Sequence, residues 1–251
     1  MDETRKITRL RIQPALKNLY AGVMLTLAID TALDACAAAV LDTSASNVIA
    51  QESQLMKRGH AEALMPLVDR VMREAKVAFS TLDRIAVTTG PGSFTGLRVG
   101  IAAARGIALA AAKPAVGLTT LAAYAAPHIA HDDKTAIAVA IDARHQHVYL
   151  QVFAPGGRAA VPPRIASAED AARAALTHGS IRLTGTGAAL LTAAWPPRER
   201  PPIIIDERRA PDIVWVGRLA IAANESSSPP KPLYLRAPDA QPQAAARLPR
   251  R

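Results

Sequence analysis

The residues best suited to chemistry lie in a glycine-rich string, Gly90 to Gly100 (GPGSFTGLRVG), between a predicted strand and a predicted helix. A helix start of this kind leaves backbone N–H groups unpaired and favours anion binding, with Gly92 and Ser93 as the candidate contacts. A P-loop is excluded, because Leu97 and Arg98 stand where its Lys-Ser/Thr pair would be. A second interpretation stays open: the glycines permit a tight turn and close helix packing.

Two carboxylates follow predicted strands at matching places along the chain. Asp30-Thr31 ends the first strand, and Asp142-Ala143-Arg144 ends a later one. A carboxylate in such a place could hold a metal–nucleotide, orient water, or cap the turn. Neither turn contains a glycine, so close approach of a phosphate to the backbone is disfavoured. We therefore expect at most weak nucleotide or anion contacts, at Asp30, Thr31, Asp142 and Arg144.

Histidine and serine give no further site. His128 and His131 are three apart and His145 and His147 are two apart, but neither pair has a third ligand nearby in the sequence. The serines lack the strand–G-x-S-x-G–helix signal of a nucleophile. The sequence thus predicts no catalytic residue, no metal site and no bound cofactor.

The glycine string also predicts a close-packing helix face. Gly92, Gly96 and Gly100 are four apart, so on a helix they form a flat stripe along which another backbone can approach. The helix over 95–112 is apolar nearly all round, with Arg98 and Arg105 as its only charges. Such a helix is buried in its own chain or covered by a partner.

The elements that position these residues begin with a meander of strands followed by an α/β alternation. The predicted order is strands 25–30, 35–41 and 47–52, helix 60–77, strand 84–89, helix 95–112, strand 115–118 and helix 121–130. Helix 60–77 is amphipathic, with apolar residues at steps of three and four. We expect these elements to form a first lobe over 24–133, in which helices 60–77 and 95–112 are either core helices or parts of a subunit interface.

A second lobe is expected over 134–239. It is predicted to hold strands 135–141, 147–153 and 181–183, helices 168–176, 188–194 and 213–223, and an irregular connection over 195–212 that is crowded with Pro and Arg. Residues 1–23 are interpreted as a flexible extension, with Met24 as an alternative start, and 240–251 as a disordered basic tail.

Composition limits the class of protein. The chain has 251 residues, 50% hydrophobic and 20% charged, which is enough apolar material for folded lobes. Its single cysteine fits a reducing compartment, so a cytoplasmic location is expected, and charges interrupt the richest apolar run, so no membrane span is expected. More than half of the +9 charge lies in the two ends, and nine scattered aromatics are too few for a base-stacking RNA reader.

Five strings of the sequence are distinctive when taken together. They are Leu27 to Thr31, His60 to Pro66, Gly90 to Gly100, Asp142 to Arg144 with Tyr149, and Tyr234 to Arg236. These strings cover about residues 24–239, and the glycine string is the specific one. Together they resemble the TsaB (YeaZ) family, whose members are subunits of the bacterial machinery that makes threonylcarbamoyladenosine in tRNA. The resemblance implies an actin-like, sugar-kinase and Hsp70-type fold with two lobes, each a mixed sheet flanked by helices.

The resemblance also implies a non-catalytic partner. The catalytic subunit, TsaD, holds a metal through a His-x-x-x-His pair, but here Leu64 stands four residues after His60. The implied activity is to bind and activate TsaD, with the ATPase TsaE as a further partner, tRNA reached only through the complex, and self-association when alone. The interface implied on the two helices comprises His60, Leu64, Leu67, Val68, Val71, Gly96, Leu97, Gly100, Ile101 and Ala104.

Two other classes of function stay open at this stage. One is a small-molecule phosphotransferase of the same superfamily, which tight binding of ATP by the isolated chain would favour. The other is an M22-type, glycoprotease-like metallopeptidase, which a stoichiometric metal ion would favour.

Overall fold

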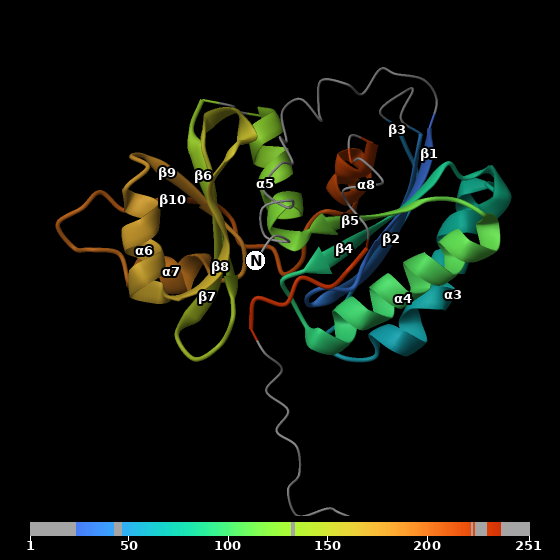
Figure 1. Ribbon diagram of the computed structural model, residues 1–251, viewed down its shortest axis with the longest axis horizontal. Coiled ribbons are helices and arrows are strands. Elements are labelled where there is room, and N and C mark those ends of the chain that lie inside the picture. Colours follow the sequence, from blue (N-terminus) through green and yellow to red (C-terminus); the bar gives the residue numbers. More distant parts are fainter. Residues whose placement is uncertain (1–23, 43–46, 132–133, 222, 224–229, 237–251) are drawn as a thin grey trace, which may run out of the picture.

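The computed structural model describes residues 24–42, 47–131, 134–221, 223 and 230–236 and shows two lobes side by side (Figure 1). The extension 1–23 and the tail 240–251 lie outside the described residues. The first sheet contains β1 (Leu25–Asp30), β2 (Ala35–Asp42), β3 (Asn47–Leu55), β4 (Arg84–Gly90) and β5 (Ala115–Thr119). The second contains β6 (Ala136–Asp142), β7 (His147–Phe153), β8 (Ala159–Ser167), β9 (Ile181–Thr184) and β10 (Ile203–Asp206). The helices are α3 (His60–Ala75), α4 (Phe94–Ala111), α5 (Thr120–His131), α6 (Ala168–Leu176), α7 (Ala188–Ala193) and α8 (Ile213–Ile221), with short 3-10 turns at Phe79–Thr81 and Pro155–Gly157.

The two lobes repeat one topology. The first sheet has the order β3-β2-β1-β4-β5, and the second has the same order in β8-β7-β6-β9-β10. In each, the first strand pairs antiparallel with the second and parallel with the fourth. Both sheets are therefore mixed, and β1 and β6 are equivalent central strands. This confirms the expected two-lobed α/β fold.

Helices cover both faces of each sheet, which explains why the central strands are apolar throughout. In β2, Cys36, Ala38 and Val40 face α3 and α4, while Ala37 and Ala39 face α5 and α8. The core on the α5 side continues into the second lobe through residues of β6 and β7. Helices α6 and α7 cover the far face of the second sheet. Figure 1 shows α5 and α8 as the layer between the sheets.

Helix α8 returns to the first lobe, although its sequence position predicts a place in the second. It packs on β1 and β2, and Val216, Leu219 and Ala220 are buried there. The buried Arg84 of β4 holds its end: the guanidinium donates to the carbonyls of Ala220 and, at 2.9 Å, of Ala223. The Ala220 carbonyl also accepts the N–H of Ala223 at 3.1 Å, so Arg84 ties together the end of the helix and the residues just beyond it.

Two strands were missed in the predicted elements. β8 contains Pro162 and Pro163, which argue against a strand interior, but it is an edge strand paired with β7 alone, with register shifts along its length. β10, inside the predicted irregular connection, has four residues after Pro202 and pairs only with β9. Edge strands tolerate such sequences because one side of the backbone needs no partner.

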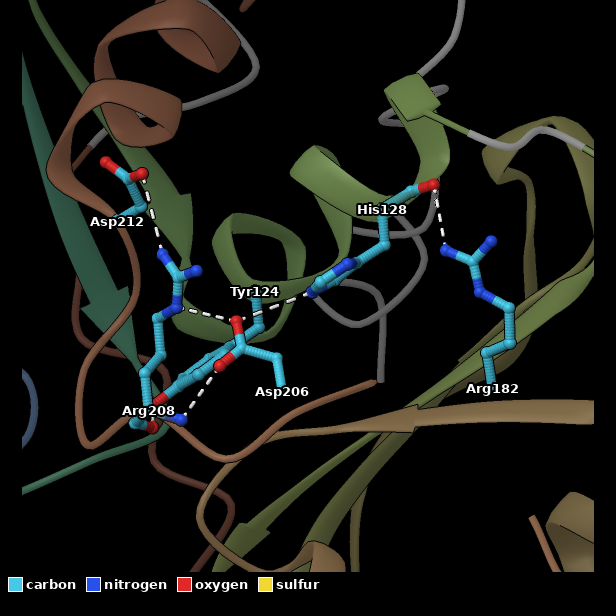
Figure 2. Close-up of polar contacts among 6 residues, drawn as sticks. All are labelled: Tyr124, His128, Arg182, Asp206, Arg208 and Asp212. Atoms are coloured by element: carbon cyan, nitrogen blue, oxygen red, sulfur yellow. Dashed lines mark hydrogen bonds and ion pairs between the residues drawn. The ribbon is translucent and has the colours of Figure 1, made fainter. Parts of the chain in front are cut away.

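A polar cluster joins α5 to the second lobe and to the segment that leads back to α8 (Figure 2). Asp206 pairs with the Nε of Arg208 at 2.6 Å and lies 3.6 Å from Nε2 of His128. Tyr124 donates from its hydroxyl to the carbonyl of Arg208 at 2.8 Å, and Arg182 donates to the carbonyl of His128 at 3.1 Å. Burial lowers the pKa of His128, and the two arginines lower it further. The cluster fixes the chain where it crosses between lobes.

Candidate functional site

The glycine string is fastened to the turn that follows β1. Ser93 caps α4 by accepting from the Gly96 N–H at 3.3 Å, and its own N–H donates to the carbonyl of Ala32 at 2.7 Å. Thr31 donates from its hydroxyl to the carbonyl of Gly96 at 2.7 Å. The N–H groups of Ser93 and Gly96 thus have partners in this chain. This favours the packing interpretation of the string over the anion site expected at Gly92 and Ser93.

The small-residue stripe faces the same turn. A Cβ at Gly92 would lie 2.2 Å from the carbonyl oxygen of Ala32, and one at Gly96 would lie 2.1 Å from that of Thr31. A Cβ at Gly100 would meet the Thr31 hydroxyl oxygen at 2.4 Å. The stripe lets the backbone after β1 approach α4, so the chain itself occupies the space expected for a partner.

Asp30, the first of the two strand-end carboxylates, is fully buried. Its Oδ1 accepts hydrogen bonds from the Thr88 hydroxyl and, at 3.1 Å, from the N–H of Ala32. Its Oδ2 is buried without a hydrogen-bond partner among the described residues. Burial raises the pKa of Asp30 to about 6, although the bond from Thr88 acts in the opposite direction. Thr88 was not among the predicted site residues, because a contact between β1 and β4 leaves no local signal.

The raised pKa of Asp30 predicts a pH-dependent stability. The folded pKa of about 6 lies above the ordinary aspartate value of 3.8, so the folded state binds more protons between these values and its stability falls as the pH rises through that window. The contribution lost is roughly 3 kcal/mol at 1.36 kcal/mol per pKa unit. Asp30→Asn should remove it while keeping an oxygen for Thr88. Urea unfolding of both proteins at pH 4 and pH 7.5 measures the difference, and identical pH dependence in the two proteins would contradict this account.

Asp142, the second strand-end carboxylate, differs from Asp30 because it is exposed. Its Oδ1 accepts from the N–H of Arg144 at 2.7 Å, and its own N–H donates to the Thr186 hydroxyl at 3.1 Å. The side chain of Arg144 is exposed. The two carboxylates therefore occupy equivalent strand ends, as predicted, but in different environments.

The side chains expected to contact a partner are buried in the first lobe. The apolar ones belong to one core with the face of the first sheet that α3 and α4 cover, and none of the set is exposed: His60, Leu64, Leu67, Val68, Val71, Gly96, Leu97, Gly100, Ile101 and Ala104. A surface that packs on its own sheet is not available to a second protein. The expectation that these residues contact a partner is therefore corrected. The ring of His60 lies with Nε2 at 3.1 Å from the carbonyl of Leu33.

The opposite face of the same helices is exposed. On α4 it carries Ala102, Gly106 and Leu109, with Leu109 85% exposed, and on α3 it carries Met65, which is 48% exposed. Space around Gly106 is open, because a Cβ there would meet no atom within 4 Å. Within the described ranges, α4 is also the one helix with the length and apolar composition of a membrane span, but its other face is buried against the sheet and α3.

Comparisons with known proteins agree with the fold. The family model of TsaD, tRNA N6-adenosine threonylcarbamoyltransferase, matches residues 44–179, just over half of the chain. The chain is 36% identical over 126 residues to the tRNA threonylcarbamoyladenosine biosynthesis protein TsaB of Escherichia coli K12, covering 50% of this chain and 53% of TsaB. It thus spans about half the length of the TsaB proteins that it matches.

Two further relatives match nearly their full lengths. An uncharacterized protein of Mycobacterium tuberculosis H37Rv is 32% identical over 223 residues, which are 87% of this chain and 94% of that protein. A crystal structure from Pseudomonas aeruginosa, described as a protein with similarity to the peptidase YeaZ, superposes with a TM-score of 0.71 at 29% identity. It covers 85% of this chain and 100% of its own.

Proposed function

Because the chain belongs to the TsaB (YeaZ) family, we propose that it is a non-catalytic subunit of the bacterial system that forms threonylcarbamoyladenosine in tRNA, where it binds and activates TsaD. In this proposal TsaD transfers the threonylcarbamoyl group to the adenosine beside the anticodon, in the cytoplasm. The match to the TsaD family model supports it, since two proteins of one fold can present equivalent helix pairs to each other across a pseudo-twofold axis.

The observation that carries the proposal is that this chain fills its own candidate site. The turn after β1 lies against the glycine string, with the Ala32 carbonyl bonded to the N–H of Ser93. At the place where TsaD has the second histidine of its metal pair, Leu64 is buried in the core. These features favour a scaffold over a phosphotransferase or a metallopeptidase.

The partner surface in this proposal is the exposed face of α3 and α4, defined by Met65, Ala102, Gly106 and Leu109. On α4 the small residues and Leu109 lie beside the exposed Arg105, and on α3 Met65 lies among exposed charged residues; no described part of the chain covers this face. Exposed apolar patches on a folded protein commonly mark contacts with other proteins. The same face would serve self-association in the absence of TsaD, and TsaE would dock on the assembled pair.

The test is co-expression of the full chain with TsaD, followed by light-scattering chromatography of the purified material. We expect a stable complex with both chains. Two separate proteins at micromolar concentration would contradict the proposal. ATP turnover by the chain alone, or proteolysis abolished by a chelator, would support the two rival functions instead.

A further inference from the structure

Two segments far apart in the sequence meet where the lobes adjoin. Residues 231–236, here called the strap, run from the end of β4 to the turn between β6 and β7. The N–H of Leu233 donates to the carbonyl of Thr89 at 2.7 Å in the first lobe. The guanidinium of Arg236 donates to the carbonyl of Ala143 at 3.0 Å in the second. The strap thus places its side chains beside the turn that follows Asp142.

An aromatic and guanidinium stack lies on the strap. The rings of Tyr234 and Phe94 are 5.1 Å apart between centroids, and the guanidinium of Arg98 lies 3.7 Å from the centroid of the Phe94 ring. Arg98 also donates from Nε to the Tyr234 hydroxyl at 3.1 Å. The side chain of Tyr234 remains 40% exposed and Arg98 is exposed. An aromatic ring held beside a cation offers a flat surface to a further planar group.

The turn 144–146, which lies beside the strap, has a backbone conformation that is unfavourable for residues other than glycine. Arg144, His145 and Gln146 have φ values of 63°, 52° and 58°, in the left-handed region that favours glycine. Hydrogen bonds hold this shape, from the N–H of His147 to the carbonyl of Arg144 at 3.0 Å and from Ala143 to His147 at 2.9 Å. All three side chains of the left-handed residues are exposed. Strained residues with exposed side chains, where glycine would fit without cost, point to a use for those side chains.

The charge of this region is positive. Arg98 bonds to Tyr234 of the strap, and Arg236 of the strap bonds to the carbonyl of Ala143, the residue before the exposed Arg144. Three arginines thus lie along the strap against one exposed carboxylate, that of Asp142. Such a surface attracts a polyanion.

We propose that the strap, its aromatic stack and the turn 144–146 form a contact surface for single-stranded RNA. The arginines contact phosphates, and an unpaired base stacks on the exposed face of Tyr234. Every nucleotide of single-stranded RNA joins a phosphate to a planar base, whereas an acidic peptide has a planar side chain only where it contains an aromatic residue. The choice of RNA rests on the proposed function. It changes the expectation that tRNA is reached only through the complex, because it gives this chain a direct contact. It also changes the expectation that the scattered aromatics form no surface for base stacking, because the fold brings Phe94 and Tyr234 together.

The position of the aromatic stack on α4 supports the proposed RNA contact. Phe94 and Arg98 lie in the first turns of α4, and the proposed partner surface at Ala102 and Gly106 begins on the next turn of the same helix. RNA bound at the strap would therefore lie beside a protein bound on α4.

The test is the binding of a fluorescein-labelled anticodon stem-loop RNA to the full chain, followed by anisotropy between 50 and 250 mM salt. Contacts with three phosphates predict a slope of log affinity against log salt of about −2, since each contributes about −0.7 on a single strand. Arg144→Gln should weaken the slope by about 0.7. Arg198→Gln, which removes an equal charge from an exposed site in the second lobe, should leave the slope unchanged.

Stacking is tested separately. Tyr234→Ala should weaken RNA binding by about tenfold or more, while Tyr234→Phe should restore most of it, because phenylalanine keeps the ring. Binding that is insensitive to Arg144→Gln and Tyr234→Ala, in variants with unchanged melting temperature, would overturn the proposal. Equal losses on heparin, which has no bases, for Tyr234→Ala would overturn the stacking.

Failure of this proposal is distinguishable from failure of the proposed function. Arg144→Gln lies outside the α3 and α4 face, so it should still co-purify with TsaD. A chain that binds RNA as predicted but forms no complex with TsaD would overturn the proposed function and leave this surface standing. A chain that binds TsaD but shows no RNA binding would overturn the RNA contact surface and leave the proposed function standing.

Discussion

Replacing Gly96 by alanine is expected to lower the melting temperature of the isolated chain by about 10 °C. The added Cβ would lie 2.1 Å from the carbonyl oxygen of Thr31, which is backbone and cannot rotate away. Overpacking of this kind costs about 1–3 kcal/mol or more, and each kcal/mol shifts the melting temperature of a chain of this size by about 2–4 °C. Calorimetry of the purified protein measures the shift.

The same helix provides a matched control. Gly106→Ala adds an identical methyl group at a position where a Cβ meets no atom within 4 Å. Since alanine is the better helix former by about 1 kcal/mol, this variant should melt about 2–4 °C higher than the wild type. Equal destabilisation by both substitutions would mean that the loss at Gly96 does not come from contact with the Thr31 turn.

Gly106→Arg is expected to abolish binding to TsaD, by at least a hundredfold in affinity, and to leave the chain folded. The arginine would project from the exposed face of α4, where the open space around Gly106 tolerates it in the isolated chain. In a complex it would separate two helix faces and bring a charge into a desolvated contact, which costs several kcal/mol. Surface plasmon resonance with immobilised TsaD measures the affinity of each variant.

The control for this loss is Ala193→Arg, on the exposed side of α7 in the second lobe. It adds the same side chain to a helix away from α3 and α4, so TsaD should bind it as tightly as the wild type. If Gly106→Arg bound TsaD with wild-type affinity, this face of α4 would not be the partner surface. If both variants lost TsaD binding, the added positive charge and not its position on α4 would explain the loss.

The sequence shows which residues of α3 and α4 share a face but not what covers that face. Periods of three and four placed Leu64, Leu67 and Val71 of α3 on one side correctly, and this side is buried. Burial by the chain's own sheet and burial by a partner give the same pattern, because both remove the same apolar area from water. The structure separates them, since the sheet occupies that side.

Contacts between residues far apart in the sequence could not be predicted from the sequence either. The bond between Asp30 and Thr88 joins residues 58 apart, and the contact of Arg84 with the end of α8 joins residues more than 130 apart. Neither has a local signal. By contrast, the strand ends at Asp30 and Asp142 and the helix start at Ser93 were predictable, because turn residues and caps act on their own backbone.

The most direct test of a scaffold that acts through TsaD is a reconstituted transfer reaction. Threonylcarbamoyl adenylate and tRNA are incubated with this chain, with TsaD, or with both, and modified adenosine is measured by mass spectrometry. We predict no product from this chain alone and a strong rise in TsaD-dependent product as it is added up to equal amounts. Product from this chain alone, or TsaD activity that is unchanged by its addition, would contradict the account.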